Sequence, residues 1–303
     1  MRLIALPPCD KGTADQRNKS HSFYPSAAAP FFQLSIKKHE TENVMKILCI
    51  GDIVSRIGRE MLFKYVEDLK YKAGIDFVIA NGENSNHGRG MTRRGYNEMK
   101  RAGVDAFTMG NHVWGAKEVV SIMENEGDVI RPANLQGKVP GTGSAVFTAH
   151  NGVKIGVINL IGQVDMQPCN SPFEAADREI ETISKITPII IVDFHAEVTS
   201  EKMAMGYYLD GRVSAVFGTH THIQTADAKI LKGGTGYITD LGMTGPADSI
   251  LGMNKNIIIN RFINGMPQRF EIAEGKGQFC GCIFTVDEEN GSCCNIERLY
   301  FEE

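Results

Sequence analysis

The chain has 303 residues, of which 42% are hydrophobic and 22% are charged, a composition typical of a globular protein with a sizeable buried core. Its formal net charge is −4 and no long run of Lys or Arg occurs, which argues against a protein that binds long nucleic acids. No apolar run approaches the roughly 20 residues of a membrane span, so we expect a soluble protein.

Residues 1–44 differ from the rest of the chain because they show neither helical nor strand periodicity. The apolar piece Leu3–Leu6 is short for a secretory signal, and two prolines follow it at once. We predict that residues 1–44 form a flexible N-terminal extension that is not part of the fold. Residues 45–303 are then expected to form a single domain.

From Met45 onward, apolar strand candidates alternate with helix candidates. Strands are predicted at MKILCI (45–50), DFVIA (76–80) and AFTM (106–109), with helices near Arg59–Lys72 and Arg93–Arg101. A polar tip follows each strand: Gly51-Asp52, then Asn81 to Asn84, then Gly110 to His112. This layout predicts successive βα units.

The middle of the chain predicts a hairpin over residues 144–161 that turns at Asn151-Gly152. A helix follows, and its start is marked by Ser171, Pro172 and Glu174, which form a capping box with proline at the first helical position. Two further strands then end in polar tips, one with His195 and one with His220 and His222.

The C-terminal part predicts β-rich segments around a Gly-rich loop region near residues 242–278. The run 241–252 has no Walker-type spacing, and no G-x-G-x-x-G follows a strand, so nucleoside triphosphate and dinucleotide sites have no support. We expect this run to line the mouth of a site.

Seven cysteines, at positions 9, 49, 169, 280, 282, 293 and 294, make an odd number in a chain long enough to bury a core. This predicts reduced thiols and a cytoplasmic protein. A hairpin centred on Asn290-Gly291 pairs Cys282 with Leu299 and Cys280 with Phe301, so that no two cysteines of the hairpin face each other. We favour ordinary packing for these cysteines, with metal binding as the alternative.

The alternation predicts an α/β layered fold with helices flanking the sheets. Its polar residues stand where the strands stop, which is the edge where open α/β sheets bind ligands. If the backbone stays extended, side chains two residues apart point to the same side, so His220 and His222 can converge on one metal ion. The ligand-type residues at the five strand ends are Asp52, Glu83, Asn84, Asn111, His112, His195, His220 and His222.

Each of these residues has a second interpretation when taken singly. An Asp or Asn after a strand is often a turn residue or a helix cap, and a single His is usually a satisfied polar side chain. Together they form a set of carboxylate, amide and imidazole donors without a thiol. Such a set suits one or two divalent ions such as Mn, Fe or Zn.

The motifs resemble those of a known family. Gly51-Asp52, NGEN (81–84), GNH (110–112), His195 and GTHTH (218–222) resemble the ordered motif blocks of the calcineurin-like dimetal metallophosphoesterases. More closely, GDIV, NGENSNHGRG, MGNHVW, DFHAEVTSEK, GTHTHIQTAD and YITDLGMTGPADSILGM resemble the YmdB-like family of 2′,3′-cyclic-nucleotide 2′-phosphodiesterases over residues 45–303. The resemblance implies a layered metallophosphoesterase fold, in which two β-sheets pack together and are flanked by helices.

The resemblance also implies a site with two divalent metal ions, Fe or Mn first and Zn as an alternative. Glu83, whose carboxylate can span two ions, stands where the wider superfamily has a bridging Asp, and Asn84 is thought to fill the ligand role of a missing His. The expected ligands are Asp52, Asn84 and His222 for one ion, and Asn111, His195 and His220 for the other. The division between the two ions is less firmly implied than the set.

Three further residues have roles that the resemblance or the spacing leaves open. His112 follows Asn111 directly, so on an extended backbone it faces away from the metal, and by resemblance it contacts the phosphate and protonates the leaving ribose oxygen. The alternative is that it merely packs nearby. His87 borders the substrate or lies in solvent, and Asp193 either orients an imidazole or is simply buried.

The function implied is hydrolysis of small phosphodiesters, with 2′,3′-cyclic nucleotides converted to 3′-nucleotides by in-line attack of a metal-bridging hydroxide. One alternative is a related phosphomonoesterase or nuclease. Another is a non-catalytic, metal-bound regulatory protein that senses a nucleotide. The expected partner is a small nucleotide, without a membrane or a long nucleic acid, and the resemblance hints at a homo-oligomer.

Overall fold

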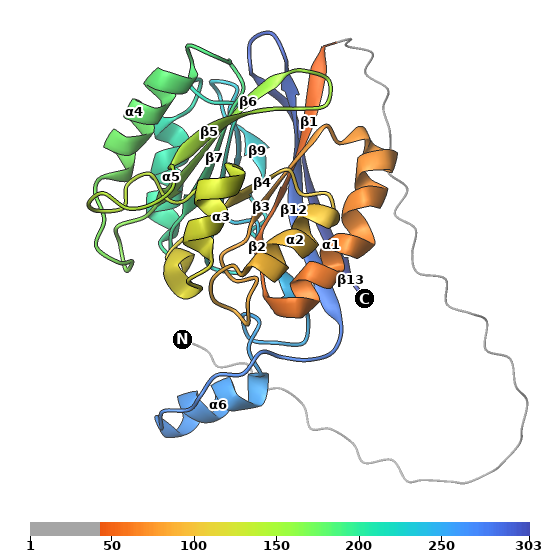
Figure 1. Cartoon of the computed structure of the whole chain (residues 1–303), viewed down its shortest axis with the longest axis vertical. Coiled ribbons are helices and arrows are strands. Elements are labelled where there is room, and N and C mark those ends of the chain that lie inside the picture. Colours follow the sequence, from red (N-terminus) through yellow and green to blue (C-terminus); the bar gives the residue numbers. More distant parts are fainter. Residues whose placement is uncertain (1–42) are drawn as a thin grey trace, which may run out of the picture. The chain divides into compact units, whose positions relative to one another are not determined.

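The computed structural model describes residues 43–303 (Figure 1). Nearly all of the predicted extension, and with it Cys9, lies outside the described residues. The first strand, β1, begins at Val44, one residue before the predicted start of the domain. No helix among residues 43–303 is both long and apolar enough to cross a membrane.

The first sheet has the strand order β2-β11-β12-β1-β3-β4, with β13 paired to β12. In this sheet β1 runs parallel to β3, and β3 runs parallel to β4, as predicted for βα units. Its strands are β1 (Val44–Ile50), β2 (Asp52–Ile53), β3 (Phe77–Asn81), β4 (Ala106–Thr108), β11 (Met243–Pro246), β12 (Gly277–Asp287) and β13 (Cys293–Glu302).

The second sheet has the order β5-β6-β7-β8-β10-β9, and β6, β7, β8 and β10 run parallel. Its strands are β5 (Ser144–Thr148), β6 (Lys154–Ile161), β7 (Ile190–His195), β8 (Ala215–Thr219), β9 (Lys229–Ile230) and β10 (Gly236–Ile238). The hairpin of β5 and β6 is antiparallel and turns through Gly152 at φ 87°, which confirms the predicted Asn-Gly turn.

Helices cover the outer faces of both sheets (Figure 1). The first sheet packs against α1 (Ser55–Leu69), α2 (Arg93–Arg101) and α3 (Val119–Glu126), and the second against α4 (Pro172–Ile183) and α5 (Thr199–Tyr208). Short turns of other helix types lie at Lys70–Gly74 and Val113–Gly115. The predicted layers, two packed sheets flanked by helices, are thus confirmed.

The apolar strand sequences follow from burial on both faces of each sheet. In β1, Ile47 and Cys49 lie in the core between the two sheets, whereas Leu48 and Ile50 lie in the core under α1, α2 and α3. Because alternate side chains point to opposite faces, a strand buried on both sides reads as a continuous apolar run. The sequence MKILCI is such a run.

The sequence predicted the start of some helices correctly and the start of one helix incorrectly. Helix α2 has the predicted bounds, and α4 begins after Ser171, whose hydroxyl accepts a hydrogen bond from the backbone N–H of Glu174. Helix α1 begins at Ser55, four residues before its predicted start. The prediction was late because Ser55 is the first helical residue and Val54, which precedes it, provides no side-chain cap.

The Gly-rich region predicted as a loop near residues 242–278 contains two elements that the sequence did not predict, the short strand β11 and a helix. Helix α6 (Lys255–Asn264) begins after Asn254, whose side chain accepts from the N–H of Asn256, and ends at Gly265 with φ 69°. Only Ile258 of α6 is buried, and Phe262 and Ile263 are exposed. The apolar residues of α6 therefore lack the one-sided pattern that reveals a helix packed on a core.

The register predicted for the C-terminal hairpin is wrong by one residue. The structure pairs Cys282 with Arg298 and Cys280 with Tyr300. The hairpin loop lies earlier than predicted, because Asp287 N–H bonds to the carbonyl oxygen of Ser292 and the loop therefore spans residues 288–291. Next to the loop the pairing differs from the prediction by two residues, since Val286 pairs with Cys293, and the irregularity between Thr285 and Val286 adds a residue to β13 and reduces the difference to one.

Six cysteines lie in the described part of the chain and all are free. No two of them pair within the hairpin, although Cys49 of β1 lies opposite Cys282 of β12. Burial raises the pKa of the Cys49 thiol well above its ordinary value and that of Cys280 to about 12. Such thiols behave as apolar packing groups, in agreement with the favoured interpretation.

Candidate metal centre

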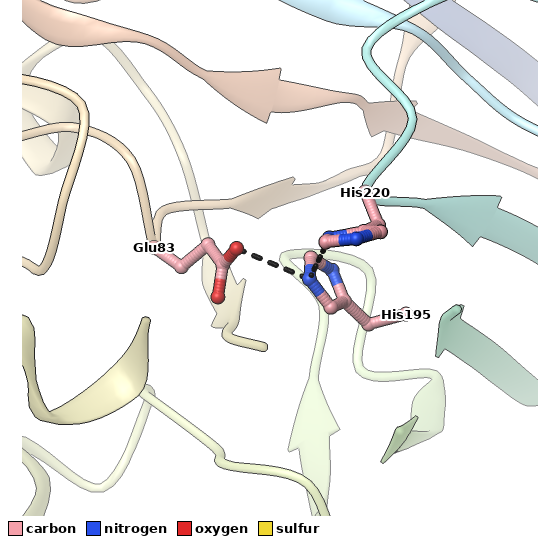
Figure 2. Close-up of side chains that lie close together, drawn as sticks. All are labelled: Glu83, His195 and His220. Atoms are coloured by element: carbon pink, nitrogen blue, oxygen red, sulfur yellow. Dashed lines mark hydrogen bonds and ion pairs between the residues drawn. The ribbon is translucent and has the colours of Figure 1, made fainter. Parts of the chain in front are cut away.

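The carboxyl ends of five strands from both sheets meet at one place and bring together every side chain predicted as a metal ligand. Figure 2 shows the middle of this cluster, where Glu83, His195 and His220 point toward one another. One ligand-type atom from each of these three residues lies within 4.8 Å of the others. The other four predicted ligands, Asp52, Asn84, Asn111 and His222, are each in contact with at least one member of the cluster.

One half of the cluster surrounds the Nε2 atom of His195. This nitrogen lies 2.8 Å from Asn111 Oδ1, 3.1 Å from Glu83 Oε1 and 3.1 Å from His220 Nδ1. An imidazole nitrogen carries at most one hydrogen and cannot hydrogen-bond to three acceptors at once. The convergence of electron-pair donors on one point is what a bound cation requires.

The other half of the cluster surrounds the amide of Asn84. Its Nδ2 atom lies 3.3 Å from Asp52 Oδ1, 3.1 Å from His222 Nε2 and 3.5 Å from Glu83 Oε1. A half-turn of the amide exchanges its nitrogen and oxygen, so that Oδ1 faces the same three atoms. Glu83 thus contacts both halves through one carboxylate oxygen.

Gly110 provides the space in which the cluster forms. A Cβ atom at this position would lie 2.3 Å from His195 Nε2 and 2.5 Å from Glu83 Oε2. Any side chain would therefore occupy the space between these two groups. The donor set and this space fit a divalent cation held by oxygen and nitrogen ligands.

The two histidines of the GTHTH motif reach the cluster by a route that differs from the predicted one. Strand β8 ends at Thr219, and His220 and His222 have φ values of 99° and 65°. The expectation of an extended backbone is therefore wrong, although both side chains do join the cluster. Positive φ at a residue other than glycine costs on the order of 1–3 kcal/mol and persists where the surroundings impose it.

The backbone at His112 is not extended either. Its φ of −94° and ψ of 12° place it in a turn, and not in an extended segment after β4. Its backbone N–H donates to Glu83 Oε2 at 2.8 Å, and its half-buried side chain lies beside the cluster.

His87 is exposed, which agrees with the solvent alternative for this residue.

Asp193 contacts an imidazole through an intermediate hydroxyl, and burial alone does not describe it. Thr219 Oγ1 donates to Asp193 Oδ1 at 2.7 Å and lies 2.9 Å from His195 Nδ1. Because the single hydroxyl hydrogen goes to Asp193, His195 Nδ1–H donates to Thr219. The lone pair of His195 is then on Nε2, which faces the cluster.

The pKa values of the cluster follow mainly from burial. Desolvation lowers the pKa of His195 to about 4 and that of His220 to about 3, so both imidazoles are neutral near pH 7, the state in which they can bind a metal. Desolvation raises the pKa of Asp52 and of Glu83, against the opposing effect of nearby histidines. A cation bound here would favour the ionised carboxylates.

Sequence reasoning missed Glu197, whose Oε2 lies 3.1 Å from His220 Nε2, and Asn81, whose side chain donates to Asp193 at 3.2 Å. Asn81 belongs to the NGEN block and Glu197 follows His195 by two residues. Their types and positions were therefore visible. Which groups they contact depends on how the two sheets meet, which no local pattern encodes.

Two packed sheets with a cluster of carboxylate, amide and imidazole groups at their common edge define the metallophosphoesterase class of fold. The chain belongs to the YmdB-like protein family, whose model matches residues 48–299.

Relatives and solved structures agree with this assignment. The chain is 48% identical over 259 residues to a 2′,3′-cyclic-nucleotide 2′-phosphodiesterase of Bacillus subtilis, covering 86% of this chain and 98% of the relative. It is 37% identical to a putative phosphatase/phosphodiesterase of Mycoplasma genitalium, covering 84% and 92% of the two chains.

Among solved structures, a novel phosphatase from Mycoplasma pneumoniae is similar with a TM-score of 0.81 at 36% identity, covering 86% of this chain and 94% of that one. A hypothetical protein from Thermus thermophilus has a TM-score of 0.80 at 40% identity, covering 86% and 100% of the two chains.

Gly110→Ala tests whether the space beside His195 is needed. The new methyl group would displace the His195 ring and the Glu83 carboxylate, and overpacking of this kind destabilises a fold by about 1–3 kcal/mol. We expect calorimetric titration with Mn²⁺ to show loss of binding in a protein that is still folded by circular dichroism. Wild-type affinity in Gly110→Ala would contradict this account of the space.

Thr219→Val tests the relay that sets the tautomer of His195. Loss of the hydroxyl leaves His195 Nδ1 and Asp193 without their shared partner, and loss of such a supporting contact typically weakens metal binding 10–100-fold. The same titration measures the effect. Thr219→Ser keeps the hydroxyl and is the matched control, so equal losses in both variants would refute the relay.

Proposed function

We propose that this chain is a metal-dependent phosphodiesterase that hydrolyses 2′,3′-cyclic nucleotides to 3′-nucleotides. The observation that carries the proposal is the gathering of seven ligand-type side chains in one cluster, with Glu83 in contact with both halves. The B. subtilis relative, which is 48% identical, has a name that specifies this substrate class and the 2′ bond.

The proposed centre holds two divalent ions. Asp52, Asn84 and His222 would bind one ion, Asn111, His195 and His220 would bind the other, and Glu83 would bridge them. The contacts support this division, because each set of three surrounds a different atom, Asn84 Nδ2 or His195 Nε2. Oxygen and nitrogen ligands accept Fe, Mn and Zn, and we propose Fe or Mn with Zn as the alternative.

When bound, the ions would lower the pKa of a water molecule and neutralise charge that develops on the phosphoryl oxygens. The chain supplies the fixed positions. Glu83 is held by the N–H of His112, and Asp52 is held by the N–H of His220 at 3.0 Å. Both carboxylates are thus oriented by backbone donors, so that little reorganisation is needed during the reaction.

His112 is the proposed proton donor. Burial lowers the pKa of its imidazole, against the opposing effect of the Glu83 carboxylate. A phosphate anion bound beside the imidazole would raise this pKa again and favour the protonated form. In the proposed reaction water loses a proton to solvent, and the resulting hydroxide oxygen bonds to phosphorus. The bond from phosphorus to the ribose 2′-oxygen breaks, and the His112 proton passes to that oxygen.

A phosphomonoesterase is the second candidate function, because the M. genitalium relative and the M. pneumoniae structure are described with the word phosphatase. A nuclease that acts on long chains has less support. In α2, Arg93, Arg94 and Lys100 each pair with an acidic side chain, which reduces the net positive field available to a long phosphate backbone.

Turnover tests the proposal directly. The wild-type chain with added Mn²⁺ or Fe²⁺ is expected to hydrolyse a chromogenic phosphodiester and 2′,3′-cyclic nucleotides, with a 3′-phosphate as the product. We expect Glu83→Gln to reduce turnover below detection and His112→Asn to reduce kcat about 10²–10⁴-fold, as for loss of a general acid. Chromatography of the products separates 3′- from 2′-nucleotides and identifies the bond that breaks.

His150→Asn is the matched control for His112, because His150 is exposed in the turn between β5 and β6. A panel of monoesters in the same assay decides between diesterase and monoesterase. Absence of turnover with every divalent metal tried would reject the enzyme in favour of a nucleotide-sensing protein.

The domain division is also a proposal, with residues 45–303 as the single catalytic domain. A chain that begins at Met45 is expected to match the full chain in the same turnover assay, and a loss of turnover would reject the division. Self-association and a cytoplasmic location stay predictions.

A further inference from the structure

A buried ion pair lies next to the turn that carries His220 and His222, and no step of the proposed reaction uses it. Lys202 of α5 is 1% exposed and Asp240, two residues after β10, is fully buried. Lys202 Nζ lies 2.6 Å from Asp240 Oδ2. Lysine is almost never fully buried unless it is paired, so the position of this residue calls for a physical reason.

Lys202 contacts the strand end that precedes the two histidines. Its Nζ also donates to the carbonyl oxygen of Thr219 at 2.8 Å, at the last residue of β8. Its aliphatic stem crosses Gly218, where a Cβ atom would lie 3.0 Å from Lys202 Cδ. The ammonium group therefore anchors the point at which the backbone leaves the sheet.

Asp240 contacts the residue between the two histidines. Its Oδ2 accepts hydrogen bonds from the backbone N–H of Thr221 at 3.2 Å and from the Thr221 hydroxyl at 2.7 Å. Thr221 separates His220 from His222, the two residues with positive φ. The ion pair thus contacts the turn both before His220 and between the two histidines.

The same carboxylate is linked to the Asp52 side of the cluster. Asp240 Oδ1 accepts from the N–H of Gly242 at 2.7 Å, and the Gly242 carbonyl accepts from the backbone N–H of Asp52 at 3.1 Å. One buried carboxylate therefore fixes the spacing between the segment that carries Asp52 and the turn that carries His220 and His222.

A gain in folding stability does not explain why the Lys202–Asp240 pair is buried. Replacing a buried ion pair with uncharged residues of similar volume is often neutral or stabilising, because desolvation offsets much of the attraction between the charges. The contacts instead point to a positional role. Four donors reach Asp240: Lys202 Nζ of α5, the N–H and the hydroxyl of Thr221 between the two histidines, and the N–H of Gly242, whose carbonyl oxygen accepts from Asp52.

We propose that Lys202 and Asp240 are positioning residues that hold His220 and His222 in their left-handed backbone conformations and thereby aim both imidazoles at the metal cluster. The consequence for metal binding rests on the proposed function, whereas the consequence for the backbone of the turn does not.

The test uses the full chain with Lys202→Met and Asp240→Asn combined, which removes both charges and keeps both volumes. Amide hydrogen exchange of residues 219–225 in the metal-free protein is expected to become at least about tenfold faster, with the other segments unchanged. Calorimetric titration is expected to show Mn²⁺ affinity weakened 10–100-fold. Wild-type exchange and wild-type affinity in the folded variant would overturn the proposal.

Lys70→Met is the matched control, because Lys70 pairs with Asp105 at 3.1 Å at the opposite ends of the strands. It removes a partly buried lysine and should change neither measurement. If the double variant does not fold, Thr221→Val decides, since it removes only the hydroxyl donor to Asp240. Faster exchange confined to 219–225 in Thr221→Val supports the proposal, and unchanged exchange rejects it.

The design separates this inference from the proposed function. If the wild type binds Mn²⁺ but hydrolyses no phosphodiester, the proposed function fails and the Mn²⁺ affinities still decide the role of the pair. If the wild type binds no Mn²⁺, hydrogen exchange decides that role alone.

Discussion

The carboxylate of Glu83 is fully buried and lies between an imidazole nitrogen at 3.1 Å and an amide nitrogen at 3.5 Å. Asp52, also fully buried, lies 3.3 Å from the same amide nitrogen. Two carboxylates withdrawn from water at such short range are unfavourable as anions, which is why burial raises the pKa of both. A multivalent cation between them would remove this penalty, and the rest of the proposed centre would hold both carboxylates in position for it.

Several buried residues hold the side chains of the cluster in position. His195 is oriented by Thr219 and Asp193, and the turn with His220 and His222 is contacted by Lys202 and Asp240. These groups come from the ends of strands, from the segment just after β10 and from α5. Because the supporting contacts are buried, they add geometry at the cost of desolvation. Functional sites typically accept such a loss of folding stability, because their side chains must be held in a fixed geometry.

Much of the fold and of the candidate site could be predicted from the sequence. Strands buried on both faces give continuous apolar runs, and the polar residues that follow them stand out, so Asp52, Glu83 and His195 were visible as strand-end residues. The type of each side chain and its place at the edge of a sheet are local properties. Resemblance to known motifs then assembled them into one site.

The parts of the prediction that were wrong have different physical causes. The prediction of an extended backbone at His220 ignored Asp240, a partner twenty residues further along the chain that binds the turn. The last hairpin has its loop one residue earlier than the Asn290-Gly291 pair indicates, and its ladder is irregular at Thr285. Helix α6 lacks a buried face that would give it helical periodicity. A tertiary contact therefore explains the first error, whereas the hairpin error arises within the hairpin and α6 was missed because most of its surface is exposed.

We propose, as the central point, that Glu83 would bridge two cations. Anomalous scattering from crystals of the full chain grown with Mn²⁺ tests it most directly. The account predicts two peaks about 3.5–4 Å apart, one beside His195 Nε2 and one beside Asn84, with a Glu83 carboxylate oxygen in contact with both. No peak at Glu83, or peaks at which Glu83 is not a ligand, would contradict the account.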